Sequence, residues 1–113
     1  MGTFAVGDVL LVRFPFSGLQ SSKVRPVLVA ALSDFDNVIV CQITSKPPIT
    51  GASVQIDGKT DNSGLNRISF VRPDKIFTAD PGLITRKIGR IGGSTKRKVC
   101  KNIVDVFGPL KNE

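Results

Sequence analysis

The chain has 113 residues, a length that suits one domain with a single hydrophobic core. Its hydrophobic content of 41% and charged content of 22% are those of an ordinary globular protein, whereas the net charge of +7 favours an acidic partner, most commonly nucleic acid. The sequence has no histidine, no stretch apolar enough to span a membrane and no signal-peptide pattern, so the usual general base and metal ligand are excluded and we expect a cytoplasmic protein.

The first third of the chain predicts two strands. Residues 9–14 (VLLVRF) follow the turn signal Gly7-Asp8, and residues 16–23 (FSGLQSSK) are polar and predict a mobile loop. The second strand is predicted over 24–32, where an unbroken apolar run follows Arg25 and Pro26. Proline has a fixed φ and no backbone donor, so it belongs at the start of a strand and keeps the preceding arginine extended. On this pattern alone, a solvent-facing rim residue is the better interpretation of Arg25.

The middle of the chain predicts further strands separated by turns. Residues 33–37 (SDFDN) predict a tight turn and 38–44 (VIVCQIT) a third strand, which makes a hairpin with 24–32. A proline-containing loop over 45–51 precedes a short strand at 53–56 and a turn at 57–62. Residues 68–71 and 74–78 predict strand with a bend at Pro73, and 84–91 predict one more strand.

Helical periodicity occurs at the end of the chain. Ser94 is suited to cap a helix, Cys100, Ile103, Val104 and Phe107 recur at helical spacing, and Gly108-Pro109 is predicted to end it. The sequence therefore predicts a single domain, residues 1–113, that is mostly β. We expect a small, strongly bent sheet or barrel of about five to seven strands with one packed C-terminal α-helix.

The side chains available for chemistry are few. Glu113 is the single glutamate, and the aspartates lack clustered metal-ligand spacing, so neither a metal site nor a cofactor is expected. Cys41 and Cys100 have no CxxC spacing and lie in apolar patterns, so we expect reduced core residues. An enzyme built on this chain would use arginine, lysine, threonine, serine and backbone groups.

Three segments occur in a fixed order: a Gly-Asp-led strand ending in VRFPFS, then KVRPVLV, then CQITSK. The segment FVRPDKIFTADPGLITRKIGRIG and one amphipathic helix follow. This combination resembles the MazF/PemK-like family of toxin endoribonucleases over residues 7–107. The resemblance implies an SH3-like barrel that forms homodimers and cleaves single-stranded RNA, such as mRNA, sequence-specifically and without a metal. It also implies an antitoxin whose disordered acidic segment holds the toxin inactive. Loops 33–37 and 45–51 are shorter than in larger family members, so the cleavage sequence is not predicted.

The resemblance also assigns catalytic residues. The arginine of the RP motif is Arg25, the threonine that ends the third strand is Thr44, and Ser45 is a possible helper. The predicted hairpin agrees, because the start of one antiparallel strand neighbours the end of the next. The RNA would supply its 2′-hydroxyl as nucleophile, leaving 2′,3′-cyclic phosphate and 5′-hydroxyl ends. Arg25 would stabilise the phosphorane, since a guanidinium does not readily lose a proton.

Candidate RNA contacts lie mainly in the loops. The loop 16–23 matches the family's flexible loop, where Phe16 is suited to stack on a base, although packing explains it equally well. The polar and basic candidates are Ser17, Gln20, Lys23, Lys46, Arg72, Lys75, Arg86 and Lys87, of which fewer than half are expected to contact RNA.

Other functions fit the same sequence. A gyrase-inhibiting toxin of the same architecture would use the terminal helix instead of Arg25 and Thr44. A passive barrel would bind RNA or DNA and leave it intact, with salt-dependent affinity. A family member with decayed activity is a third alternative, against which the presence of Arg25 and Thr44 counts weakly.

Overall fold

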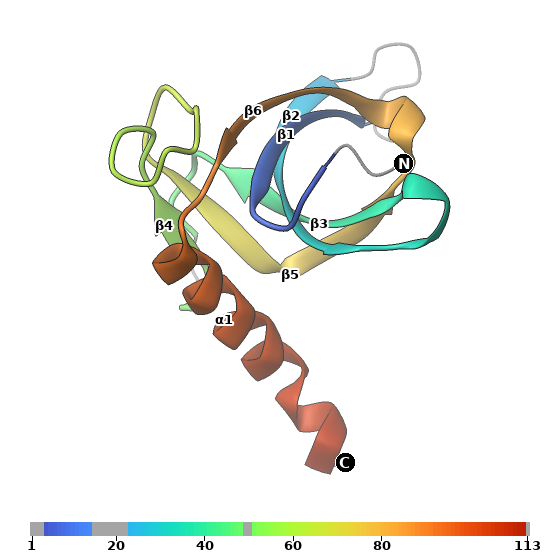
Figure 1. Cartoon of the computed structure of the whole chain (residues 1–113). Coiled ribbons are helices and arrows are strands. Elements are labelled where there is room, and N and C mark those ends of the chain that lie inside the picture. The colour runs from blue at the N-terminus through green and yellow to red at the C-terminus, as the bar shows by residue number, and fades with distance from the viewer. Residues whose placement is uncertain (1–3, 15–22, 49–50, 113) are drawn as a thin grey trace.

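The computed structural model describes residues 4–14, 23–48 and 51–112, and it contains one curled antiparallel sheet with a helix against it (Figure 1). Six strands follow the order β4-β5-β3-β2-β1-β6 across the sheet. Their bounds are β1 Asp8–Phe14, β2 Lys23–Leu32, β3 Val38–Thr44, β4 Val54–Ile56, β5 Ser69–Ala79 and β6 Ile84–Arg90. Short 3-10 turns, η1 Asp34–Asp36 and η2 Pro81–Leu83, join β2 to β3 and β5 to β6, and α1 covers Gly93–Asn112. The predicted mostly-β fold with one C-terminal helix is confirmed.

Hydrophobic residues pack on both faces of this sheet. On the concave face, Leu10, Val12 and Phe14 of β1 join Val27 and Val29 of β2 and residues of β3 and β5 in one buried cluster. On the convex face, alternate residues such as Val9, Leu28 and Cys41 form a second cluster that includes Val99 of α1. Because neighbouring residues of a strand point to opposite faces, β1 and β2 contribute to both clusters. The continuous apolar run in β2 thus reflects burial on both sides.

β5 is one strand with a bulge where the sequence predicted a bend. Cys41 pairs with Ile76, whereas the next residue of β3, Gln42, pairs with Arg72. Residues 73–75 of β5 therefore have no partner in β3, and Pro73 is buried there. Proline has no N–H to donate to the ladder, so an unpaired position in a bulge accommodates it without loss of a hydrogen bond.

The end of the helix differs from the prediction. α1 begins at Gly93, so Ser94 lies within the first turn instead of capping it, and the helix continues through Pro109 to Asn112. A proline within a helix removes one hydrogen bond and crowds the carbonyl four residues earlier, but three further helical residues follow Pro109 here. Cys100 is exposed, not buried as expected, whereas Cys41 is fully buried. Among the described residues, no helix is both long and apolar enough to cross a membrane.

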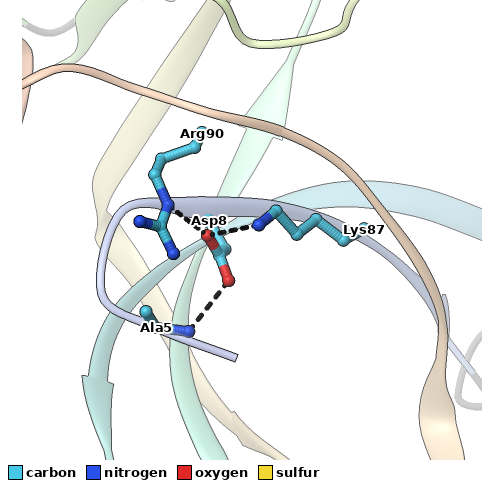
Figure 2. Close-up of polar contacts among 4 residues, drawn as sticks. All are labelled: Ala5, Asp8, Lys87 and Arg90. Atoms are coloured by element: carbon cyan, nitrogen blue, oxygen red, sulfur yellow. Dashed lines mark hydrogen bonds and ion pairs between the residues drawn. The ribbon is translucent and has the colours of Figure 1, made fainter. Parts of the chain in front are cut away.

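A buried carboxylate fastens the start of β1 to β6. Asp8 has no exposed surface, and its Oδ1 accepts a hydrogen bond from Arg90 Nε at 2.9 Å and lies 3.4 Å from Lys87 Nζ (Figure 2). Its Oδ2 accepts from the Ala5 N–H at 2.8 Å. Burial by itself raises the pKa of Asp8, but the bonds from Ala5, Arg90 and Lys87 outweigh it and hold that pKa below its ordinary value.

Asp8→Asn is expected to lower the free energy of unfolding by about 2 kcal/mol at pH 7, because charge-assisted bonds to Arg90 and Lys87 are lost. The folded pKa is lowered, so this stabilisation is complete above the ordinary carboxyl pKa of about 4 and is lost as pH falls through the lowered value. Thermal unfolding between pH 7 and pH 2 measures both effects. A variant with the same stability as wild type at pH 7, or the same acid sensitivity, would contradict this role.

Candidate functional site

A row of side chains crosses the concave face where the apolar cluster ends. Val12 of β1 pairs with Arg25 of β2, and Thr44 of β3 pairs with Phe70 of β5, which in turn pairs with Gln55 of β4. The β2–β3 ladder begins at Leu32↔Val38, shifts register between Val29 and Ala31, and ends at Val27↔Gln42. Extending this last register by two residues sets Arg25 opposite Thr44. Directly opposite residues of an antiparallel pair share one face, so this register assigns Arg25 and Thr44 to the same face of the sheet.

Arg25 is held on rigid backbone and is available to bind a ligand. It pairs with Val12 within the β1–β2 ladder, precedes the φ-restricted Pro26 and is exposed. Across residues 4–14, 23–48 and 51–112, no hydrogen bond or ion pair to its guanidinium is found. By contrast, Arg72 and Arg90 are each bound to an aspartate. With respect to the described residues, the donors of Arg25 are thus open to an anion.

Thr44 has one side of its hydroxyl engaged by the turn that follows it. Its Oγ1 accepts a hydrogen bond from the Lys46 N–H at 3.1 Å, and the residue is half-buried. Because the oxygen already accepts from the backbone, its own proton points elsewhere and remains available for donation. Ser45 is exposed in the same turn. Thr44 thus keeps its hydroxyl hydrogen for donation while its oxygen accepts from the turn.

A bidentate ion pair borders the row. Arg72 pairs with Gln42 in the ladder, and its Nε and terminal nitrogen lie 3.1 and 2.9 Å from the two carboxylate oxygens of Asp74. This hydrogen bond raises the pKa of Arg72 and lowers the pKa of Asp74. On the convex side, burial raises the pKa of the Cys41 thiol to about 11, with a smaller contribution from Asp74. The ion pair fixes the Arg72 guanidinium at the edge of the concave face.

The other predicted RNA contacts are distributed around this row. Lys23, Lys46 and Lys75 are exposed at the start of β2, after β3 and in the β5 bulge. Arg86 pairs with Leu11, whose neighbours Leu10 and Val12 face the concave cluster, so the register does not bring Arg86 to Arg25. Lys87 is engaged by Asp8. Phe16, Ser17 and Gln20 lie outside the described residues.

Gln42, Gln55, Phe70 and Asp74 are the neighbours of this site that sequence reasoning missed. Gln55 and Phe70 alternate with buried residues of β4 and β5, as the burial patterns show. That alternation indicates that Gln55 and Phe70 share a face opposite to the buried residues, but it does not reveal which strands pair. Within the described part of the chain, no three His, Cys, Asp or Glu side chains are grouped to hold a metal ion. The row can bind an anion through Arg25 and donate a hydrogen bond from Thr44.

Comparison with known proteins gives a family and confirms the fold. The family model described as PemK-like, MazF-like toxin of type II toxin-antitoxin system matches residues 5–107. Mycobacterium tuberculosis toxin MazF-mt6 has a TM-score of 0.73 at 24% identity, over 89% of this chain and 96% of that chain. MazE-MazF from Deinococcus radiodurans has a TM-score of 0.74 at 18% identity, over 93% and 96%. An endoribonuclease in complex with its cognate antitoxin, from a mycobacterial species, has a TM-score of 0.72 at 17% identity, over 96% of both chains. No match was found among curated protein sequences.

Proposed function

Because this chain belongs to the family of PemK-like, MazF-like toxins of type II toxin–antitoxin systems, we propose that it is a sequence-specific endoribonuclease acting on single-stranded RNA without a metal. The observation that supports the proposal is the β2–β3 register, whose extension beyond Val27↔Gln42 sets the exposed Arg25 opposite Thr44. Two solved structures similar in fold are described as endoribonucleases, one of them with its cognate antitoxin. The net charge of +7 suits a polyanionic substrate.

The proposed chemistry needs no histidine, because RNA carries its own nucleophile. The 2′-hydroxyl oxygen bonds to the adjacent phosphorus, and the bond from phosphorus to the 5′-oxygen breaks. The products are a 2′,3′-cyclic phosphate and a 5′-hydroxyl; the 2′-hydroxyl loses its proton to water, and the 5′-oxygen gains one from water. Arg25 donates two hydrogen bonds to the non-bridging oxygens as their negative charge increases. Thr44 donates a hydrogen bond from its hydroxyl to the same phosphate and orients it, with Ser45 beside it.

The proposed protein partners are an antitoxin and a second copy of the chain. An acidic antitoxin segment would be attracted to the exposed cations Arg25, Lys23 and Lys46, where it would exclude RNA. Self-association would use the convex face, where a groove of about 550 Å³ runs between α1 and the sheet. The groove is lined mainly by apolar residues, among them Leu28, Ile39, Ile76, Val99 and Ile103. Val104 and Phe107 of α1 are also more than half exposed, at 62% and 53%. Exposed apolar surface of this kind would be buried by a homodimer.

Incubation of a long single-stranded RNA with the purified protein in EDTA tests the proposal. We expect cuts at a small number of recurring sequences, in EDTA and in magnesium alike, with duplex RNA resistant. Mapping the fragment ends gives the recognised sequence. RNA that is bound but stays intact under both conditions would contradict the proposal and support the passive nucleic-acid-binding barrel. RNA that is neither bound nor cut would favour a toxin that acts by contact with a protein.

A further inference from the structure

Phe70 is an aromatic residue that the hydrophobic core does not use. It lies in β5 between β3 and β4, paired with Thr44 on one side and Gln55 on the other. Its strand neighbours Ser69 and Val71 are 3% and 0% exposed, whereas Phe70 is half-buried on the opposite, concave face. Among the described residues, the members of both core clusters and of the hydrophobic groups packed against them do not include Phe70. Its ring is therefore left on the open part of that face.

The other described phenylalanines have different surroundings. Phe14 and Phe77 pack edge to face in the concave cluster, with ring centroids 4.9 Å apart and an interplanar angle of 81°. Phe4 packs against the same cluster. Phe35 is 90% exposed, but it lies in η1, at the opposite end of the β2–β3 hairpin from Arg25 and Thr44. Phe107 lies on α1. Phe14 is two residues from Val12, the partner of Arg25, but it is buried at 4% exposure. Phe70 is thus an aromatic side chain beside the candidate site that is not buried in the core.

We propose that Phe70 is a stacking platform for one RNA base next to the scissile phosphate. The inference rests on the proposed function and adds a base-binding subsite to it. Adjacent strands are about 4.8 Å apart, so Phe70 is one strand from Thr44 and two from Arg25. A phosphate held by Arg25 and Thr44 thus has an attached base within reach of the Phe70 ring. Unpaired bases stack on aromatic rings in single-stranded RNA recognition, and every base offers a π-face.

Two glutamines next to Phe70 supply the groups that distinguish one base from another. Gln55 is exposed and directly opposite Phe70, and Gln42 precedes Thr44 by two residues on the same face of β3. Each amide carries both a donor and an acceptor, so it can form a paired set of hydrogen bonds with a base edge. Arg72, fixed by Asp74, lies opposite Gln42 and closes this side of the subsite. The subsite therefore combines stacking on Phe70 with edge readout by Gln55 and Gln42.

The test compares wild type with Phe70→Leu, which keeps an apolar side chain without an aromatic face, and with Phe70→Tyr, which keeps the ring. Phe35→Leu is the matched control, since that aromatic is distant from the site. The probe is a short single-stranded RNA with 2-aminopurine at each position in turn. It carries a 2′-deoxy sugar at the mapped cut site, or is unmodified if no cut is found. Its fluorescence reports stacking and affinity, and thermal unfolding checks that each variant is folded.

We expect fluorescence quenching at one position with wild type, Phe70→Tyr and Phe35→Leu, and loss of that quenching with Phe70→Leu. Binding by Phe70→Leu should weaken by about 10-fold. If folded Phe70→Leu shows the same quenching and RNA affinity as wild type, the stacking proposal is wrong, even if the wild type cleaves the RNA. Phe70-dependent stacking on RNA that wild type never cleaves would support the platform and contradict the proposed nuclease. Absence of RNA binding by wild type would overturn both.

Discussion

Substitution of Arg25 by lysine is expected to reduce kcat/KM for RNA cleavage by about 100-fold, and Arg25→Ala by more. Lysine keeps the positive charge but loses the planar fork that donates two parallel hydrogen bonds to phosphate oxygens. Pro26 and the pairing with Val12 fix the backbone at Arg25, so a shorter or more mobile donor is not compensated by movement of the strand. The measurement is initial-rate cleavage of an oligonucleotide that contains the mapped site.

Arg13→Ala is the matched control for Arg25. Arg13 is an exposed arginine of β1 that alternates with the concave-facing Val12, so it lies on the other face of the sheet. The Arg13→Ala variant should retain the wild-type cleavage rate within about twofold, because a surface cation remote from the site contributes little. If kcat/KM of a folded Arg25→Lys variant falls by no more than twofold, Arg25 does not act through two parallel hydrogen bonds. Equal losses in the Arg13 and Arg25 variants would indicate a general charge effect.

Thr44→Val is expected to lower kcat by about 100-fold with little change in stability, because valine has nearly the same shape and lacks the hydroxyl. Thr44→Ser keeps the donor and should retain most of the activity. The Lys46 N–H loses its acceptor in the valine variant, but that group is exposed and can bind water instead. Single-turnover cleavage at saturating enzyme separates the chemical step from RNA binding.

The serine variant and the unfolding curve provide the controls for Thr44. If Thr44→Val and Thr44→Ser lose activity equally, the turn geometry matters and the hydroxyl does not. If Thr44→Val cleaves at the wild-type single-turnover rate, Thr44 has no part in the chemistry, and Ser45 becomes the hydroxyl to test.

The fold was largely predictable where local patterns and strong boundary residues agree. β3 was predicted with its observed bounds because it lies between the turn 33–37 and the prolines at 47–48. β5 was predicted in two pieces because Pro73 interrupts its pattern, and the structure joins them through the bulge. The error at Pro109 has a different origin: the Gly108-Pro109 pair was taken as a stop, whereas the helix continues for three residues beyond it. Cys100 was misplaced because only Val99 of α1 is fully buried, which periodicity does not reveal.

The candidate site was predictable only in part, because half of it depends on non-local pairing. Arg25 and Thr44 belong to one hairpin, so local patterns bring them near each other, but a register shift between Val29 and Ala31 decides which residue of β3 lies opposite Arg25. Phe70 lies opposite Thr44 because β3 pairs with β5. The register shift between Cys41 and Gln42 determines which residue of β5 is opposite Thr44. No short-range pattern contains that information. The Asp74–Arg72 pair likewise depends on the shape of the bulge.

The central claim is that the RNA supplies the nucleophile and the protein supplies Arg25 and Thr44 without a metal. The most direct test compares an RNA oligonucleotide that contains one mapped cut site with a copy that has a single 2′-deoxy sugar at that site, both in EDTA. We predict that the wild-type protein cuts the all-ribose strand, leaving 2′,3′-cyclic phosphate and 5′-hydroxyl ends, and does not cut the 2′-deoxy copy. Cleavage of the 2′-deoxy copy at the same bond, or cleavage that requires magnesium, would contradict this mechanism.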